Sequence, residues 1–363
     1  MRRFSFFLVT LICLASCGPA ADSSFNTTPV AVKSTENSPA SSGPNLEPFP
    51  DAFKAAQALG RGLNLGDALE APKEGAWGVI IEPGYFELIK KAGFDSVRIP
   101  IRWEAHAAPD APYTIDPPFF VRVDQLINGA LEQDLVVILD FHNYPELMTN
   151  PQGHQERYLA LWQQIAGYYK SYPSTLLFEL LNEPGDQLDA AQWNALSGKA
   201  LNLVRQSNPS RNVILGGANL NGYDQLEKLE LPQDDRHLIV TFHYYNPFEF
   251  THQGADWVAG MDAHLGTSWE ASQAEKAAIS AHFDQVADWA KTHDRPILLG
   301  EFGAYSEADM DSRVRWTSFV ARQAEKHGFA WAYWEFCSKF GIYDPDADVW
   351  REPLLKALVP WPG

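Results

Sequence analysis

The sequence holds two glutamates, Glu183 and Glu301, that each stand directly after a short apolar run, in LNEP at 181–184 and GEFG at 300–303. Glycoside hydrolysis needs such a pair, because one carboxylic acid protonates the leaving oxygen while a second carboxylate acts at the anomeric carbon. At a separation of roughly 5 Å the second carboxylate attacks directly, and the configuration of the sugar is retained. The two glutamates are therefore candidates for the catalytic groups of a glycosidase.

Arg98 and Tyr245 supply groups that can control the charge of this pair. Arg98 ends an apolar run in VRIP at 97–100, and Tyr245 stands in FHYY at 242–245. A guanidinium beside Glu301 keeps that carboxylate ionised, whereas a less polar setting raises the pKa of the Glu183 carboxyl. The Tyr245 hydroxyl can also steady the ionised carboxylate. These residues predict two carboxyl groups held in opposite protonation states.

Further polar and aromatic residues stand at the ends of the other apolar runs. Asn182 can hydrogen-bond the sugar 2-hydroxyl, a contact that strengthens in the transition state, and Trp334 offers a flat apolar face to a pyranose ring. His142 and His243 follow two other runs. They could join a glutamate in a metal site, but no close-spaced HxxxH or His–carboxylate motif supports one, and no metal is expected.

The elements that must position these side chains are short apolar runs separated by helical patterns. At Gln155–Tyr169 and Ala190–Gln206, apolar residues recur every three or four positions. About eight strand–helix units over roughly 300 residues predict an α/β fold, a single-domain (β/α)8 TIM barrel with its site at the carboxyl ends of the strands. An open doubly wound sheet is the alternative, disfavoured because no GxGxxG follows an early strand. The predicted strands are Gly62–Leu65, Ser96–Ile99, Leu135–Phe141, Leu176–Leu181, Asn212–Gly216, Leu238–Phe242, Pro296–Gly300 and Phe329–Trp334.

Together the strand-end residues resemble the pattern of glycoside hydrolase family 5, which belongs to a clan of retaining (β/α)8 hydrolases with catalytic glutamates on strands four and seven. The segments RGLNLG at 61–66, ALEAP at 68–72 and WAYWEF at 331–336 look like the bacterial endo-β-1,4-glucanase branch, some members of which also cleave mannan or glucomannan. The resemblance covers residues 58–360. The residues that carry it are Arg98, His142, Asn182, Glu183, His243, Tyr245, Glu301 and Trp334.

The resemblance implies a cellulase-like enzyme in which Glu183 is the acid/base and Glu301 the nucleophile. Its substrate would be a β-1,4-linked polysaccharide, such as cellulose-type or mixed-linkage glucan, cleaved internally with retention. Neither a metal nor an organic cofactor is implied. Further sugar contacts are implied for Glu70, His142, His243, His252, Trp257, Trp334 and Glu335.

Three positions depart from the usual pattern of that branch. Asp67 stands in place of an asparagine, Asn143 in place of a second histidine, and Gly185 in place of a histidine after Asn-Glu-Pro. All three are expected near the sugar at the cleavage point, so Asp67 and Asn143 are candidate substrate-binding residues, and each exchanged hydrogen bond is worth about 1–3 kcal/mol. Exo or disaccharide-releasing action is therefore one alternative. A non-catalytic glycan-binding lipoprotein is another, which the intact Glu183 and Glu301 disfavour.

Residues 1–17 are typical of a lipoprotein signal peptide. Arg2 and Arg3 precede an apolar stretch too short to span a bilayer comfortably, and LASC at 14–17 resembles a bacterial lipobox in which Cys17 is lipidated after cleavage. An ordinary signal peptide is the alternative. Gly18, where an aspartate would mark inner-membrane retention, favours an outer-membrane lipoprotein on the periplasmic or cell-surface side. The composition of residues 18–47 predicts a flexible tether, and residues 48–363 are expected to form the catalytic domain.

The charge of the chain narrows the class of partner. Its 363 residues carry 28 Lys and Arg against 46 Asp and Glu, a net charge of −18 that excludes binding to nucleic acid through a basic surface. Neutral polysaccharide neither needs nor opposes this charge, so most of the carboxylates are expected to serve solubility. The protein is expected to act as a monomer that meets a membrane only through its N-terminal lipid.

Overall fold

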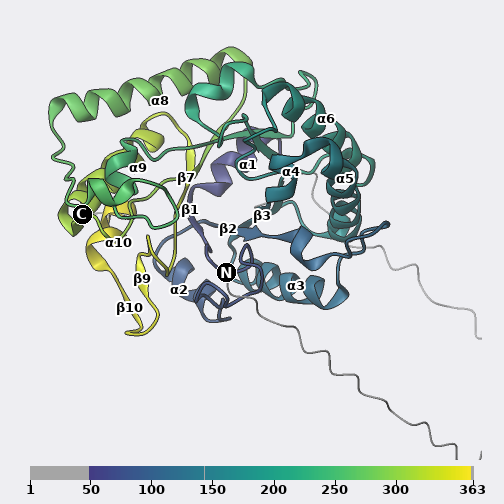
Figure 1. Ribbon diagram of the computed structural model, residues 1–363, viewed down its shortest axis with the longest axis horizontal. Helices are drawn as coiled ribbons and strands as arrows, with labels where there is room; N and C mark the ends of the chain where they lie inside the picture. The colour runs from purple at the N-terminus through teal and green to yellow at the C-terminus, as the bar shows by residue number, and fades with distance from the viewer. Residues whose placement is uncertain (1–48, 143, 361–363) are drawn as a thin grey trace, which may run out of the picture. The chain divides into compact units, whose positions relative to one another are not determined.

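The computed structural model describes residues 49–142 and 144–360, which form a closed barrel of eight parallel strands (Figure 1). β1 pairs with both β2 and β8, and this pairing closes the sheet. The predicted (β/α)8 barrel is confirmed, and the open doubly wound sheet is wrong. The barrel strands are β1 (Arg61–Asn64), β2 (Ser96–Ile101), β3 (Val136–Phe141), β4 (Leu176–Glu179), β5 (Val213–Gly216), β6 (Leu238–His243), β7 (Ile297–Glu301) and β8 (Ala330–Tyr333).

All eight predicted strands are present, with ends that differ from the prediction by one or two residues. His243 and Glu301 were expected to follow β6 and β7, but they are the last residues of these strands, because they still pair with each other across the parallel ladder. β4 instead ends early, at Glu179, so Asn182 and Glu183 lie on the loop that follows it. The catalytic candidates therefore occupy the last rung of the barrel and the loops just above it.

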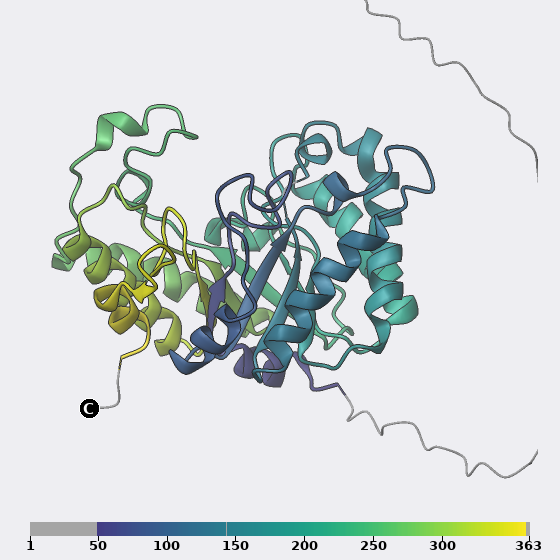
Figure 2. The same ribbon diagram turned by 90° about the horizontal axis from the view of Figure 1, so that it is seen from below.

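Helices surround the barrel, as Figures 1 and 2 show. Both predicted amphipathic helices form, and their expected apolar faces are buried. A two-stranded ribbon, β9 (Tyr343–Asp344) with β10 (Val349–Trp350), follows the barrel. The helices are α1 (Ala52–Leu59), α2 (Tyr85–Lys91), α3 (Pro117–Leu131), α4 (Pro145–Thr149), α5 (Pro151–Tyr168), α6 (Ala190–Ser207), α7 (Phe248–Thr251), α8 (Gln273–His293), α9 (Met310–Lys326) and α10 (Glu352–Leu358), with 3-10 turns η1 (Trp103–His106), η2 (Tyr169–Ser171), η3 (Tyr223–Lys228) and η4 (Met261–His264).

Helix α1 closes the amino-terminal end of the barrel. Asp51 caps its amino terminus, and the Asp51 side chain accepts a hydrogen bond from the Lys54 N–H at 3.0 Å. Its apolar face packs on alternate strand residues, among them Ile138 and Leu298, in a cluster separate from the main core. With this end plugged, a site can open only at the carboxyl ends of the strands.

Two sequence predictions fall outside the described residues. These are the lipoprotein signal peptide with Cys17 and its tether at 18–47, and the side chain of Asn143. Within the described ranges, no helix has both the length and the apolar character needed to cross a membrane.

Candidate active site

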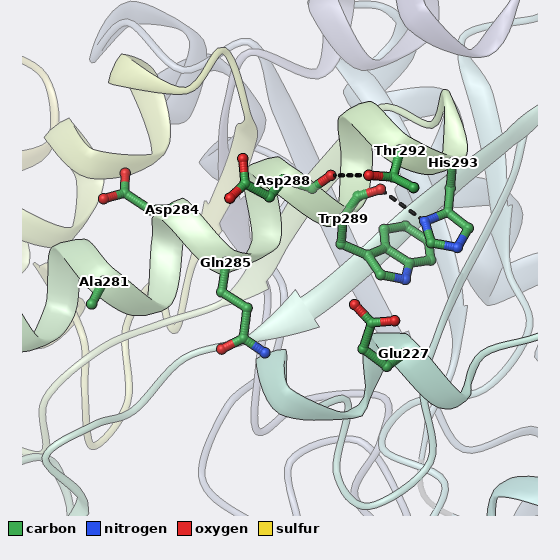
Figure 3. Close-up of a pocket in the computed structure, with 8 residues that line it drawn as sticks. All are labelled: Glu227, Ala281, Asp284, Gln285, Asp288, Trp289, Thr292 and His293. Carbon is green, nitrogen blue, oxygen red and sulfur yellow. Dashed lines mark hydrogen bonds between the residues drawn. The ribbon is translucent and has the colours of Figure 1, made fainter.

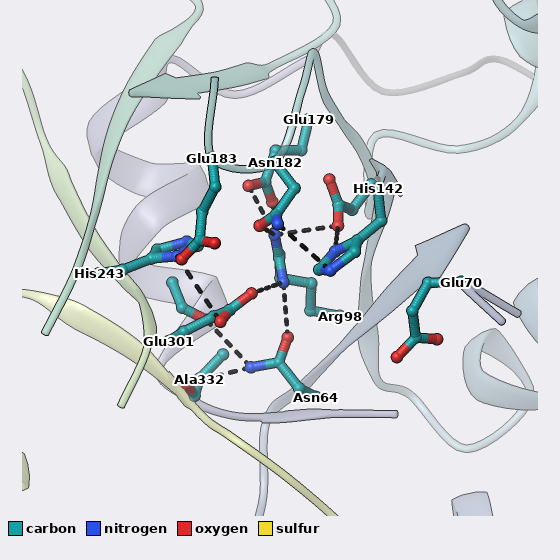
Figure 4. Close-up of polar contacts among 12 residues, drawn as sticks. Asn64, Glu70, Arg98, His142, Glu179, Asn182, Glu183, His243, Glu301 and Ala332 are labelled. Carbon is teal, nitrogen blue, oxygen red and sulfur yellow. Dashed lines mark hydrogen bonds and ion pairs between the residues drawn. The ribbon is translucent and has the colours of Figure 1, made fainter. Parts of the chain in front are cut away.

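The strand register brings polar residues from distant parts of the chain to one rim of the barrel. Asn64 in β1 is level with Arg98 in β2, and His243 in β6 is level with Glu301 in β7. Parallel strands in a closed barrel all end at the same rim, so these pairs converge on one cluster (Figure 4).

Arg98 is fully buried at the centre of this cluster. Its guanidinium donates to Glu301 Oε1 at 2.8 Å and to the two oxygens of Glu179 at 2.7 and 3.0 Å, and its Nη2 lies 2.9 Å from Asp140 Oδ2. Burial lowers the pKa of Arg98, but the three carboxylates outweigh it and raise that pKa well above its usual value. For an acid the effect of burial is the opposite: it raises the pKa of Asp140 to about 7, although the charge of Arg98 opposes this shift. One cation thus holds three buried acids together.

Glu183 and Glu301 face one another with His243 beside them (Figure 4). One ligand atom from each of the three side chains lies within 4.8 Å of the others. His243 Nδ1 is 2.8 Å from Glu183 Oε1 and 3.6 Å from Glu301 Oε2. Burial lowers the pKa of His243 to about 4, so its ring is neutral at neutral pH. The two carboxyl groups are close enough to act on the same glycosidic bond.

The surroundings of the two carboxyl groups differ. Glu301 is almost buried and accepts hydrogen bonds from Arg98 at 2.8 Å and from the Tyr245 hydroxyl at 2.9 Å. Glu183 keeps 29% of its side chain exposed, and burial raises the pKa of its carboxyl against the opposing effects of His142 and Arg98. Glu301 is held in place by two donors, whereas Glu183 reaches into the open part of the site.

Glu183, His243 and Glu301 are also the only group in the described ranges whose ligand atoms converge closely enough for a metal ion. The hydrogen bond between His243 and Glu183 already accounts for their approach. A carboxylate pair with a neutral histidine is equally the donor set of an acid–base site, so the geometry requires no ion.

Asn182, His142 and Asp140 continue the hydrogen bonding from Arg98 along one side of the site. Arg98 Nη2 donates to Asn182 Oδ1 at 2.9 Å, and Asn182 Nδ2 lies 3.2 Å from His142 Nε2. His142 Nδ1 in turn lies 2.6 Å from Asp140 Oδ2. Side chains from β2, β3 and the loops after β3 and β4 therefore form one connected chain.

Trp334, the predicted sugar platform, follows directly after β8. Its ring is stacked on the His142 ring, with centroids 5.7 Å apart and planes inclined by 14°. Gly66 makes room for it, because a Cβ at that position would lie 2.9 Å from the indole Cζ2. The ring is half-buried, so part of it faces the site.

The long loop after β6 carries His252 and Trp257. His252 is stacked on Phe248 with ring centroids 4.0 Å apart, and its Nδ1 lies 3.0 Å from Thr251 Oγ1. Trp257 is 49% exposed, and the Lys339 ammonium lies 4.3 Å from its ring centroid. An exposed aromatic ring can stack on a sugar, so the predicted role of Trp257 stays a prediction.

Glu335 stabilises the loop after β8 rather than facing the open site. Its side chain is fully buried, and burial raises its carboxyl pKa to about 8. A sugar hydroxyl could bind it only by sharing or displacing the backbone donors that it already accepts. These donors are the N–H groups of Cys337, Ser338 and Phe340.

Glu70 and Asp67 hold the loop after β1 in a similar way. Glu70 accepts the backbone N–H groups of Asp67 and Ala68, and it lies apart from the Arg98 cluster in Figure 4. Asp67 Oδ2 accepts a hydrogen bond from Ser338 Oγ at 2.6 Å, which ties this loop to the one after β8. Both carboxylates are engaged with the protein itself.

Sequence reasoning missed Asn64, Asp140 and Glu179, all partners of Arg98. A signal for the two acids was present, because each lies inside a strand that is otherwise apolar, in VVILDF at 136–141 and LLFE at 176–179. A charged residue in a buried strand is rarely tolerated without a partner. The partner, however, lies on another strand and cannot be identified from spacing.

The family with the description "Cellulase (glycosyl hydrolase family 5)" matches residues 62–340 of this chain. The chain belongs to glycosyl hydrolase family 5. Endoglucanase H of Acetivibrio thermocellus is 36% identical over 328 residues, covering 89% of this chain and 35% of that protein. Cellulase/esterase CelE of the same organism is 30% identical over 82% of this chain and 37% of its own length. The chain thus spans little more than a third of these two relatives.

Solved structures also agree with the family 5 assignment, and they match this chain over their own full length. Thermotoga maritima Cel5A has a TM-score of 0.84 and 50% identity, covering 85% of this chain and all of its own, and it has been solved with cellobiose and with mannotriose. The cellulose synthase subunit Z of Clostridioides difficile has a TM-score of 0.81 and 40% identity.

A hollow of about 520 Å³ lies between α8 and η3 of this family 5 hydrolase (Figure 3). Trp289 and His293 stack within its wall, with ring centroids 4.2 Å apart, and Glu227 faces them. None of the predicted site residues lines it. The hollow belongs to the helical layer and not to the rim of the barrel.

Proposed function

We propose that this family 5 hydrolase cleaves β-1,4-linked glucan internally, with retention of configuration, using Glu183 as acid/base and Glu301 as nucleophile. Cellulose-type and mixed-linkage glucans are the proposed substrates, with glucomannan and mannan as further ones. No metal or cofactor takes part in this reaction.

The close approach of Glu183 and Glu301 carries the proposal. An oxygen of each carboxyl group lies within 4.8 Å of the other. Retaining glycosidases hold these groups about 5–5.5 Å apart, whereas inverting enzymes need about 6.5–9.5 Å to admit a water molecule. The separation therefore favours direct attack by one carboxylate.

The surroundings of the two groups support the assignment of roles. Burial raises the pKa of Glu183, as a general acid requires, and His243 lies within hydrogen-bonding distance of it. Glu301 is held by Arg98 and Tyr245, which orient one carboxylate toward the anomeric carbon. Asn182 is hydrogen-bonded to the same guanidinium, which supports its proposed contact with the sugar 2-hydroxyl.

The choice of substrate rests on the relatives. Several of them are named endoglucanases, and Thermotoga maritima Cel5A has been solved with both cellobiose and mannotriose. The half-buried Trp334 and the exposed Trp257 supply flat apolar faces of the kind that pyranose rings bind.

A product profile on glucan, mixed-linkage glucan, xyloglucan, glucomannan and mannan tests the proposal. We expect viscosity to fall faster than reducing ends appear, because internal cuts shorten a polymer early. NMR of the first products should show the β-anomer before mutarotation. Early α-anomer would refute retention, steady release of disaccharide would support exo action, and binding without release would support a non-catalytic glycan-binding protein.

We further propose that Cys17 anchors the enzyme in the outer membrane through a lipid and that residues 18–47 tether it there. The lipobox-like LASC at 14–17 and the polar composition of the segment that follows support this proposal.

Replacing Cys17 with serine tests the anchor, because a hydroxyl does not accept the lipid. We expect Cys17→Ser to move the enzyme from the membrane fraction to the soluble fraction, measured by detergent partitioning and immunoblotting. Cys337→Ser is the matched control and should stay in the membrane fraction. Unchanged retention of Cys17→Ser would rule out lipid anchoring.

A further inference from the structure

We propose that Asp140 is a positioning residue for hydrolysis: acting through His142, it sets the orientation in which Asn182 presents its amide to the sugar 2-hydroxyl. The inference rests on the proposed function and extends it to a residue inside β3. Asp140 is fully buried, so any influence on the sugar must pass through its neighbours.

Arg98 determines which atom of the Asn182 amide is the oxygen. A guanidinium has no acceptor, so the Asn182 atom that lies 2.9 Å from Arg98 Nη2 must be Oδ1. Nδ2 therefore points toward His142 Nε2, 3.2 Å away. Because an amide nitrogen only donates, Nε2 must be the unprotonated nitrogen of the imidazole ring.

Asp140 holds His142 in the tautomer that this arrangement requires. Burial and the charge of Arg98 lower the pKa of His142 to about 4, so the ring is neutral at neutral pH. Its one ring proton is then on Nδ1 and is donated to Asp140 Oδ2 at 2.6 Å. Arg98 Nη2 lies 2.9 Å from the same oxygen, so the chain of bonds starts and ends on one immobile guanidinium.

This chain decides what Asn182 offers to the sugar. Nδ2 carries two hydrogens, one of which is donated to His142, and within the described part of the chain no acceptor takes the other. If Asp140 no longer accepts, the His142 proton can move to Nε2, where it opposes the Asn182 N–H. Asn182 then loses its fixed orientation, and with it the 2-hydroxyl contact that strengthens in the transition state.

Glu179 provides a matched control for the charge of the cluster. It is fully buried and bonded to Arg98 as Asp140 is, but it makes no hydrogen bond to His142 or Asn182 within the described residues. A general effect on Arg98 should therefore follow from changing either acid, whereas an effect on Asn182 should follow from changing Asp140 alone.

The test compares an aryl β-cellobioside with its analogue lacking the 2-hydroxyl on the ring joined to the aryl group. We expect Asp140→Leu to lose about 10²-fold in kcat/KM on the first substrate but less than about 3-fold on the 2-deoxy analogue. Asp140→Asn keeps an acceptor for His142 and should retain activity within about 5-fold of wild type. Glu179→Gln should affect both substrates by the same factor.

Equal losses of Asp140→Leu on the two substrates, or an Asp140→Asn variant as impaired as Asp140→Leu, would overturn the positioning role. If Asp140→Leu does not fold, Asp140→Ser replaces it, because a serine hydroxyl is too short to reach His142. Turnover of the two substrates by the wild-type enzyme distinguishes a failure of the proposed function from a failure of the role of Asp140. Turnover of neither substrate rejects the proposed function, whereas turnover with equal losses rejects only the role of Asp140.

Discussion

Glu301→Ala is expected to lower kcat on β-glucan by at least about 10³-fold, because it removes the carboxylate proposed to form the glycosyl–enzyme bond. Glu301 lies at the end of β7 with Arg98 and Tyr245 bonded to its two oxygens, and no other carboxylate in the described residues takes that position beside Glu183. Initial rates of reducing-sugar release measure the loss.

Azide distinguishes the two glutamates. In Glu301→Ala, azide can enter the space of the missing carboxylate and attack the anomeric carbon directly, which gives an α-glycosyl azide. In Glu183→Ala, with an activated aryl glycoside, azide instead attacks the glycosyl–enzyme intermediate and gives the β-azide. Identical azide products from both variants would contradict the assignment of roles.

An exposed glutamate serves as the control for these variants. Glu230→Ala should keep full activity, since this residue is exposed on the surface after η3 and is not among the residues of the candidate site. Full activity of Glu301→Ala would contradict the mechanism itself.

Arg98→Met is expected to lower the free energy of unfolding by about 3–5 kcal/mol, because it leaves three buried acids without their cation. The side chains of Arg98, Asp140 and Glu179 are fully buried, so water cannot replace the lost partner. Urea denaturation of wild type and variant at pH 7 measures the difference in the free energy of unfolding. The expected difference is larger than the loss of packing that a near-isosteric change ordinarily causes.

The deficit of Arg98→Met should shrink as the pH falls toward 5. Burial raises the pKa of Glu179 against the opposing charge of Arg98, and without Arg98 this pKa can only rise further. The folded variant keeps the proton on this acid to a higher pH than the folded wild type does. The deficit therefore grows as the pH rises above the wild-type pKa and vanishes below it. Protonation at lower pH removes the repulsion that the variant creates.

Arg236→Met is the matched control for an exposed ion pair. Arg236 lies 2.9 Å from Asp294, and the two side chains are 47% and 71% exposed, so the variant should lose less than about 1 kcal/mol. Equal losses in the two variants, or a deficit of Arg98→Met that does not change with pH, would show that the Arg98 cluster does not act through buried charge.

The barrel could be predicted because its pattern is local. Each strand is a short apolar run and each helix has an apolar face, so neither requires knowledge of distant contacts. The same is true of the shared position of Glu183 and Glu301, because polar residues that end buried strands must lie at one rim of a parallel barrel. The ends of β4, β6 and β7 differ from the prediction, because the end of a strand depends on pairing with its neighbours.

What each carboxylate does depends on contacts that no local pattern contains. Glu70 and Glu335 stand near the rim as predicted, yet backbone N–H groups of the folded loops occupy their oxygens. Asp140 and Glu179 look misplaced in apolar strands until Arg98 from β2 meets them.

The sequence by itself therefore determined the barrel and the family and identified the candidate catalytic pair, because periodicity and strand-end position are properties of short segments. Only the tertiary structure decided which acids converge on the candidate site and which accept backbone N–H groups of the loops. The physical reason is that the protonation state of a buried carboxyl group depends on the donors that contact it. Glu301, Asp140 and Glu179 share one donor, Arg98, which comes from a strand far away in the chain.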